Sequence, residues 1–157
     1  ARVELDAALE LAPDDATALY ESGVWHLTAG DLDRGITTLH RAVDAEPDDG
    51  WPRVVLGLAL LAADRVDVAL PERDRAARQR DGDAEAQVIT ALACAAEGHE
   101  DEAWEMLERG RLAAEGTDAL TVNEAEDRMN ESPEAALELL STTLVPSALR
   151  ERLAARP

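Results

Sequence analysis

The sequence predicts an all-α protein, a solenoid of antiparallel helix pairs with a C-terminal capping helix. Two observations support this prediction. Small residues recur at intervals of 34 positions, and turn residues recur at the same interval between segments with apolar residues at helical spacing. The small-residue columns are Ala1, Gly35, Ala69, Ala103; Ala8, Ala42, Ala76, Gly110; and Gly23, Gly57, Ala91. Stacked arrays of this kind bury one continuous core, and most of them bind other proteins.

The unit at residues 16–49 illustrates the local pattern. Its first half, Ala16–Ala29, has apolar residues at helical spacing, and Gly30-Asp31 then form a turn in which glycine can adopt a positive φ. Asp33 is placed to cap the second helix of the unit. That helix is expected to end before Pro47, which cannot continue it.

The small residues have a mechanical explanation. Gly23 and Gly57 occupy the same column inside predicted helices, where a glycine costs about 1 kcal/mol relative to alanine. Two glycines in one column therefore indicate a packing requirement. We expect the helices to approach closely there, so that a larger side chain would push the pair apart.

Together these columns resemble the tetratricopeptide repeat (TPR) family. The residues that carry the resemblance are Leu19, Gly23, Gly30-Asp31, Leu39, Ala42 and Pro47 in one unit; Leu56-Gly57, Asp67, Ala69 and Ala76 in the next; and Ala91, Gly98, Asp101-Glu102-Ala103 and Leu107 in the third. The resemblance covers about residues 1–117 and implies a right-handed α-solenoid of 34-residue repeats. Two positions depart from the pattern. Arg73 stands in a column of leucines, and Pro71 follows the expected cap at Asp67 within the first turn, where it should be tolerated.

The repeat divides the chain into segments of one continuous domain. We expect residues 1–15 to be the second helix of a truncated repeat cut from a longer repeat protein, followed by repeats at 16–49, 50–83 and 84–117 and by a degenerate repeat plus capping helix at 118–157. The expected helices of the last segment run from about Asp118 to Met129, from the cap Ser132-Pro133 to about Thr143, and from near Ser147 after Pro146, with Arg150, Arg152 and Arg156 toward the C-terminal end.

Composition restricts the partners. The formal net charge of −19 comes from 34 acidic and 15 basic residues, and every basic residue is arginine. Such a field disfavours nucleic acid and anionic membranes and favours basic or neutral partners. The preferred interpretation of the acidic residues is a solvated outer face that maintains solubility. The sequence has no transmembrane run and no signal-peptide pattern, so the cytoplasm is the default localisation, with an upstream targeting segment left open.

The histidines and the single cysteine do not indicate a metal or catalytic site. His26, Leu60 and Cys94 share a column that is expected to pack between helices, and no histidine has metal-ligand spacing. The sequence also contains no phosphate-binding glycine loop and no nucleophile elbow. We therefore expect no catalytic residue, no metal and no cofactor in this chain, and we do not expect an enzyme.

The sequence supports a partner-binding groove better than a catalytic or metal site. In the family, the first helix of each repeat lines the concave side, and the resemblance places there a mostly apolar set: Tyr20, Val24, Leu27, Trp51, Val54, Leu58, Leu61, Val88 and Leu92. These residues are expected to face away from the core, so that Leu58→Glu and Val54→Glu should weaken partner binding and leave helix content nearly unchanged. The sequence leaves open whether a ligand, a second subunit or the capping helix covers this stripe.

The leading functional hypothesis is a non-enzymatic scaffold or adaptor. Because no arginine falls at the groove positions and the chain has no lysine, we expect the ligand to be an apolar or amphipathic, basic segment rather than a terminal carboxylate. The alternatives are a homo-oligomeric assembly module, such as a homodimer, and an accessory or regulatory domain of a larger enzyme.

Overall fold

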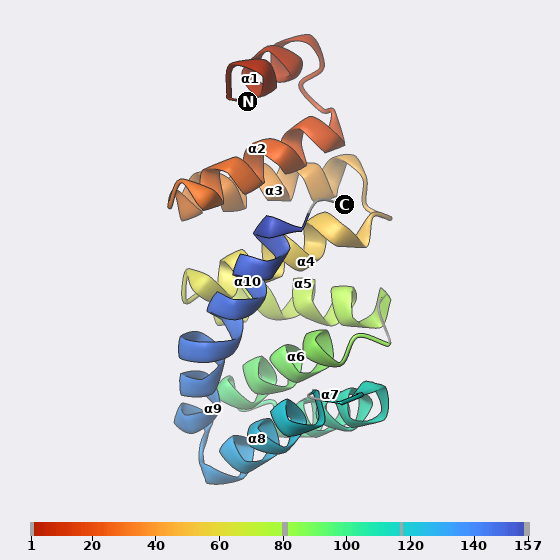
Figure 1. The fold of residues 1–157 in the computed structure, drawn as a ribbon, viewed down its shortest axis with the longest axis vertical. Coiled ribbons are helices and arrows are strands. Elements are labelled where there is room, and N and C mark those ends of the chain that lie inside the picture. Colours follow the sequence, from red (N-terminus) through yellow and green to blue (C-terminus); the bar gives the residue numbers. More distant parts are fainter. Residues whose placement is uncertain (1, 80–81, 117, 156–157) are drawn as a thin grey trace.

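The computed structural model describes residues 2–79, 82–116 and 118–155, and in these ranges the chain is a helical solenoid without strands (Figure 1). Its helices are α1 (Arg2–Leu11), α2 (Ala16–Thr28), α3 (Leu32–Ala45), α4 (Gly50–Ala62), α5 (Val66–Gln79), α6 (Ala84–Ala96), α7 (Glu100–Ala113), α8 (Asp118–Glu131), α9 (Pro133–Leu139), the π-helical turn η1 (Leu140–Leu144) and α10 (Val145–Ala154). The pairs α2–α3, α4–α5 and α6–α7 are in extensive contact. This confirms the predicted fold class. The expectation for Arg156 concerns a residue outside the described ranges.

Aspartates begin the first helix of each pair. The side chains of Asp15, Asp49 and Asp83 accept hydrogen bonds from the first free amides of α2, α4 and α6, at 2.7–3.0 Å. The predicted cap of the second helix was wrong by two residues. Asp31, not Asp33, is the N-cap of α3 and accepts from the Arg34 amide, because the turn is shorter than the sequence suggested and leaves Asp33 inside the first turn.

The turn predicted at Gly30-Asp31 is confirmed, and the other two pairs turn at the corresponding positions. Gly30 and Gly98 adopt positive φ angles of 82° and 80°, and Asp64 occupies the corresponding place with φ 57°. A left-handed residue at a helix C-terminus lets the following amides bond back to the last turn. The Arg65 amide accordingly donates to the Leu60 carbonyl at 2.9 Å.

Close helix approach explains the glycine column. A Cβ added at Gly23 would lie 2.7 Å from Leu39 Cγ, and one added at Gly57 would lie 2.5 Å from Arg73 Cδ. Both are well inside van der Waals contact, so larger side chains at these positions force their neighbours to move. The packing interpretation of the column is therefore supported by its geometry.

Arg73, the departure from the leucine column, is fully buried. Its aliphatic stem takes the place of the leucine beside Gly57, and its Nη2 donates to the Ala86 carbonyl of α6 at 3.2 Å. Burial lowers the pKa of Arg73 to about 10, while Asp83 and Glu85 act in the opposite direction. The arginine thus packs like an apolar residue and places its guanidinium near two carboxylates at the start of α6.

Pro71 lies further into its helix than the sequence suggested. Because α5 begins at Val66 rather than after a cap at Asp67, Pro71 falls beyond the first turn. Its missing amide leaves the Asp67 carbonyl without an intrahelical partner. The helix continues to Gln79 nonetheless, and Pro71 is solvent-exposed, so water can satisfy that carbonyl.

The C-terminal segment departs most from the expectation. Ser132 caps α9 as predicted, with its Oγ accepting from the Ala135 amide at 3.1 Å. The expected break before a separate last helix does not occur, because the chain stays helical from Pro133 to Ala154 through the wider turn η1. The Val145 amide donates to the Leu140 carbonyl five residues back, and this wider turn accommodates Pro146 without ending the helix.

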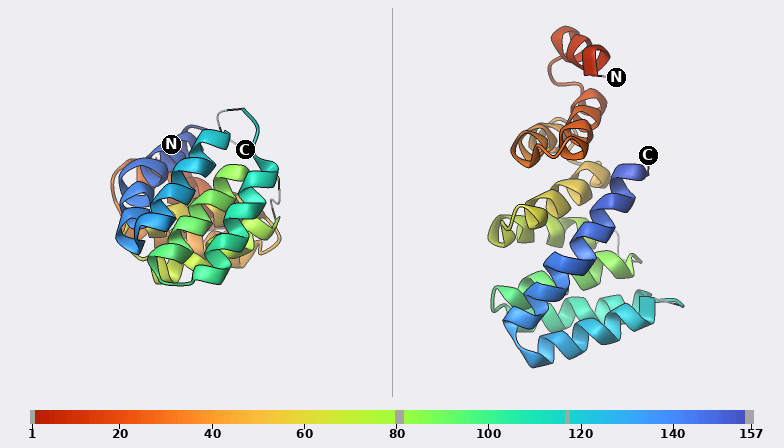
Figure 2. Two further views of the ribbon diagram at one scale, coloured as in Figure 1. Left: turned by 90° about the horizontal axis from the view of Figure 1, so that it is seen from below. Right: turned by 60° about the vertical axis from the view of Figure 1, so that its left-hand side comes forward.

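This long helix runs back along the array instead of covering its end. α9 contacts α6 and α8, and α10 contacts α4, so the C-terminal segment crosses three helices that precede it in the chain. Figure 2 shows α10 lying obliquely across the middle of the solenoid.

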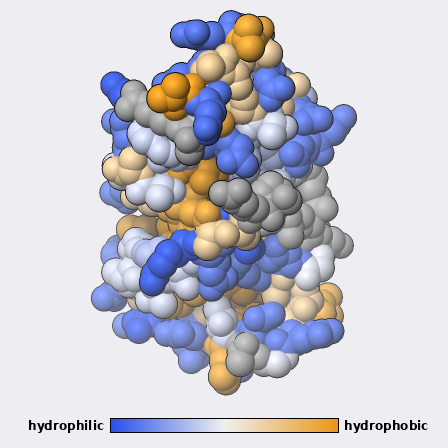
Figure 3. All heavy atoms as spheres, turned by 45° about the horizontal axis from the view of Figure 1, so that its top comes forward, coloured by the Kyte–Doolittle hydropathy of each residue, from blue (hydrophilic) through white to orange (hydrophobic). Residues whose placement is uncertain are grey.

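The core runs continuously from α2 to α10 and contains, from the C-terminal segment, Leu139, Leu140, Val145 and Ala148. Hydrophilic side chains predominate on the face seen in Figure 3, where hydrophobic colour is confined to small patches and a recess in the middle. Within the described ranges, no helix has both the length and the apolar character needed to cross a membrane.

Candidate partner-binding groove

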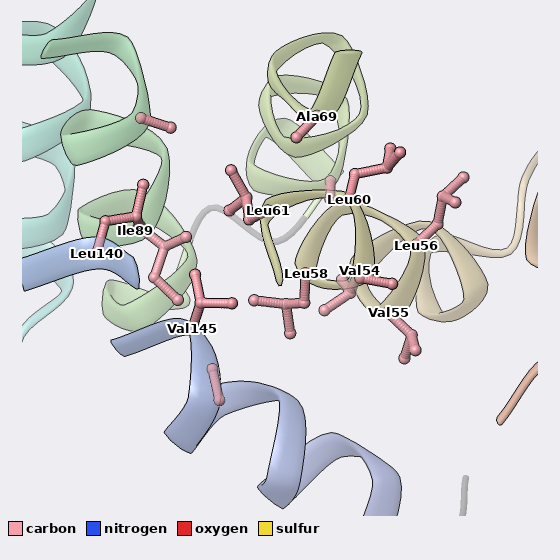
Figure 4. Close-up of a cluster of buried hydrophobic side chains, with 14 of the residues drawn as sticks. Val54, Val55, Leu56, Leu58, Leu60, Leu61, Ala69, Ile89, Leu140 and Val145 are labelled. Atoms are coloured by element: carbon pink, nitrogen blue, oxygen red, sulfur yellow. The ribbon is translucent and has the colours of Figure 1, made fainter. Parts of the chain in front are cut away.

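We use "inner face" for the side of α2, α4 and α6 that points away from α3, α5 and α7. In this structure α10 lies on the inner face of α4, with Val145 and Ala148 completely buried. Figure 4 shows Val145 directed toward Leu58 of α4, and Leu140 directed toward Ile89 of α6. A helix therefore already occupies the middle of the predicted groove.

The predicted groove residues fall into three groups. Tyr20, Val24 and Trp51 lie toward the N-terminal half, where Val24 and Trp51 are half-buried and Tyr20 is buried. Val54 and Leu58, 2% and 1% exposed, lie in the cluster next to α10. Leu27, Leu61, Val88 and Leu92 are also buried. Their part in binding a partner stays a prediction.

Two of these placements correct the expectation. Leu27 packs against Gly35 of α3, inside its own helix pair, so it does not form the groove wall. Val54 and Leu58 do point away from α5, but they do not face solvent, because the C-terminal helix covers them. A glutamate at either position would therefore meet α10 and not water.

Tyr20 and Trp51 join the first two repeats on this side. The Trp51 indole Nε1 donates to the Tyr20 hydroxyl at 2.6 Å. Burial raises the pKa of Tyr20, and the hydrogen bond from Trp51 acts in the opposite direction. The tyrosine thus remains neutral at physiological pH, and its hydroxyl accepts the hydrogen bond from the indole N–H, which fixes the ring of Trp51 at the start of α4.

Arg152 fastens α10 to both neighbouring repeats. Its Nη2 lies 2.7 Å from Glu85 Oε2 and 3.7 Å from Asp83 Oδ2, at the start of α6. Its guanidinium carbon also lies 5.7 Å from the ring centre of Trp51, within cation–π range. Burial raises the pKa of Glu85, and the charge of Arg152 acts in the opposite direction, so the ion pair offsets part of the cost of burying this carboxylate.

A hollow of about 940 Å³ remains beside α10. It is bounded by the starts of α6 and α8 and by η1 and α10, and its lining residues are Gly82, Asp83, Ala84, Glu85, Val88, Asp118, Thr121, Leu144, Ser147 and Glu151. Four of these carry carboxylates and none carries a positive charge. The hollow is open to solvent and can accept a cationic side chain next to the apolar Val88 and Leu144.

A smaller groove of about 450 Å³ lies on the opposite side, between α5 and α7. Cys94 lies at its edge and is buried, and burial raises the pKa of its thiol to about 11, with Glu102 and Asp74 adding to the shift. The thiol is therefore protonated and unreactive at neutral pH. Within the described ranges no cluster of His, Cys, Asp and Glu could hold a metal ion.

The sequence analysis missed the residues that fix the C-terminal helix. Arg152 was interpreted as a charge that suits a helix C-terminus, and Asp83 and Glu85 were not singled out. The available signal was weak. Two carboxylates flank Ala84 at the start of a helix that is otherwise nearly free of charge, and only a long-range contact shows why.

The geometry agrees with known repeat proteins. No family model matches the chain, and no curated protein matches it by sequence. Two TPR proteins of known structure are similar in fold. MamA is 17% identical with a TM-score of 0.69, over 96% of this chain and 88% of its own. YrrB, a TPR protein with an unusual peptide-binding site, is 23% identical with a TM-score of 0.67, over 94% of this chain and 80% of its own. This chain has a TPR-like fold.

Proposed function

We propose that this protein is a non-enzymatic scaffold that binds a segment of a partner protein on its inner face, through apolar and basic residues of that segment. The observation that supports this most directly is the acidic hollow beside α10. Four carboxylates surround it, and Val88 and Leu144 provide apolar surface, which together suit a segment with arginine or lysine next to aliphatic residues.

The intramolecular contacts of Arg152 support the same chemistry. This part of the inner face binds a guanidinium through Glu85 and Asp83 while the adjacent apolar surface binds an aliphatic helix face. The TPR-like fold and the peptide-binding site of the similar protein YrrB agree with a peptide ligand.

A charge-reversal experiment tests the proposal. The probes are two synthetic 18-residue helical peptides, one with leucine and arginine at amphipathic spacing and one with glutamate in place of each arginine. We expect the arginine peptide to bind and the glutamate peptide not to bind, with an affinity that falls as salt is raised. Thr121→Arg, which places a positive charge in the hollow, should weaken binding of the arginine peptide about tenfold, the effect of one close like-charge contact of ~1.4 kcal/mol.

Thr37→Arg is the matched control, because Thr37 is exposed on α3 and lies away from the inner face. Equal effects of the two substitutions would show that the peptide responds to net charge alone, and the inner-face site would have to be abandoned. If only Thr121→Arg weakens binding, proteins that the wild type retains from cells and the Thr121→Arg variant does not are candidates for the natural partner.

Self-assembly is the second candidate function. Apolar side chains are exposed at both ends of the array, namely Val3 and Leu11 on α1 and Leu112 and Leu120 near the α7–α8 connection. Head-to-tail stacking would cover them. Light scattering over a hundredfold concentration range separates the two functions. A constant monomer mass favours the scaffold, and a mass that grows with concentration favours assembly.

A further inference from the structure

The C-terminal helix covers part of the inner face, next to the hollow to which the proposed function assigns a partner. We propose that α10 is a displaceable internal ligand, and that the partner segment that replaces it is an amphipathic helix with a larger apolar residue where α10 has Ser147 and a basic residue where α10 has Glu151. This inference rests on the proposed function and specifies the ligand of the same site.

The fit of α10 to the inner face is incomplete on one side. Val145 and Ala148 are buried against the array, but Ser147 lines the hollow of about 940 Å³ between α10, α6 and α8. This hollow is open to solvent, so a side chain of a bound segment can enter it. A helix with a leucine or phenylalanine at the Ser147 position would fill more of the hollow and cover the half-buried Leu144.

The charge of Glu151, unlike that of Arg152, is also poorly matched to this site. Glu151 lines the same hollow as Asp83, Glu85 and Asp118, and its charge contributes to the raised pKa of Glu85. Like charges this close oppose one another. A basic residue at the Glu151 position would replace this repulsion with attraction, so a foreign helix can bind better than the chain's own.

The polar contacts that hold α10 are concentrated in one side chain, beside the apolar packing of residues such as Val145 and Leu149. Arg152 provides its ion pairs to α6 and its contact with Trp51, while its neighbour Arg150 is exposed. The connection to α9 passes through the π-helical turn, directly before Pro146. Such turns are points at which a helix can bend. Release of α10 can therefore pivot at η1 and leave α9, which packs on α6 and α8, in position.

The experiment compares two peptides on the full chain. The first has the sequence of residues 140–155, and the second has the same sequence with Ser147→Leu and Glu151→Arg. We expect the substituted peptide to bind at least about tenfold more tightly, by fluorescence anisotropy. Amide hydrogen exchange of α10 should accelerate when it is bound, whereas exchange of α4 should remain slow because the peptide covers it.

Arg152→Ala and Arg150→Ala form the matched pair of protein variants, with the same change of charge on the same helix. Arg152→Ala should accelerate hydrogen exchange of α10 and raise the affinity for the substituted peptide about tenfold, because α10 is then released in more of the protein. Arg150→Ala should change neither. Conversely, Glu151→Arg in the protein itself should slow hydrogen exchange of α10 and weaken binding of the substituted peptide.

The outcomes separate this inference from the proposed function. If the substituted peptide binds while α10 stays protected, displacement is wrong and the inner-face site still stands. If Arg152→Ala leaves the exchange of α10 unchanged, the contacts of Arg152 do not hold α10 in place. If neither peptide binds wild type or Arg152→Ala although α10 opens, the assigned ligand is wrong, and the response of the leucine–arginine peptide to Thr121→Arg then decides separately whether the site exists.

Discussion

The three helix pairs from α2 to α7 and the C-terminal helices α9 and α10 pack by different rules. In the pairs, each helix contacts its immediate neighbours in the chain, and glycine or alanine at fixed positions sets the distance between them. In the C-terminal segment the contacts reach back across the array, from α9 to α6 and from α10 to α4. The first kind of packing is repeated three times, and the second occurs once.

This difference in packing predicts that the repeats open less readily than α10. Contacts between sequence neighbours close short loops and reinforce one another along the array, so the repeats should unfold as a unit. Contacts of α10 close a loop of many residues, and its polar contacts depend on Arg152. Such elements are the ones that open first. We therefore expect the repeats to form the rigid surface and α10 to be the mobile part.

Truncating the core of a repeat should produce the largest loss. Leu107 is completely buried on α7, and Leu107→Ala should lower the free energy of unfolding by about 2–5 kcal/mol, from lost burial and the cavity left behind. Urea denaturation followed by circular dichroism measures this. Leu112→Ala on the same helix, at an 86% exposed position, is the control and should change it by less than about 0.5 kcal/mol.

A charge under α10 should have an intermediate and local effect. Leu58→Glu places a carboxylate against Val145, and burying it unpaired would cost several kcal/mol, so the strain is relieved by release of α10. We expect the loss to be about 1.5–3 kcal/mol, the value of one buried leucine, with most of the helix content retained. Circular dichroism with hydrogen exchange checks this. Global unfolding would show that α10 belongs to the same cooperative unit as the repeats.

Overpacking a helix pair should cost somewhat less. Gly57→Leu adds a side chain where even a Cβ would lie 2.5 Å from Arg73 Cδ. The expected loss is about 1–3 kcal/mol, reduced by the better helix propensity of leucine. Thermal unfolding measures it. The control is Gly82→Leu, since a Cβ there has no neighbour within 4 Å among the described residues. Equal melting temperatures for the two variants would remove the packing explanation of the glycine column.

The repeats could be predicted from the sequence because their determinants are local. The turns at Gly30, Asp64 and Gly98 and the glycines of the close contacts are each visible in a window of one repeat. Even the substitution at Arg73 fits this logic, because an arginine stem fills the place of a leucine. What the window did not show was that its guanidinium lies near Asp83 and Glu85.

The path of the C-terminal helix could not be predicted in the same way. Ser132 and Pro146 mark where helices begin or bend, but they do not specify the direction of the chain afterwards. That direction depends on Val145 reaching Leu58 and on Arg152 reaching Glu85, 67 residues earlier. No periodicity encodes such a contact. The sequence accordingly left three possible covers for the predicted groove residues, and only the structure shows the capping helix over Val54 and Leu58.

The smallest expected effect distinguishes the two regions chemically. Cys94 lies between α5 and α7, away from α10, and burial raises the pKa of its thiol from 9.0 to about 11. This shift lowers the thiolate fraction about a hundredfold at neutral pH, so a thiol reagent should modify the folded protein slowly. Because a raised acid pKa favours the protonated folded state, this group stabilises the fold less as pH rises from about 9 to 11, and Cys94→Ala should remove that dependence.

Opening of α10 leaves the thiol buried. The modification rate should therefore be unchanged by Arg152→Ala and increased by Leu107→Ala. A rate that rises equally in both variants would show that α10 and the repeats open together, and the distinction between a rigid array and a displaceable helix would be lost.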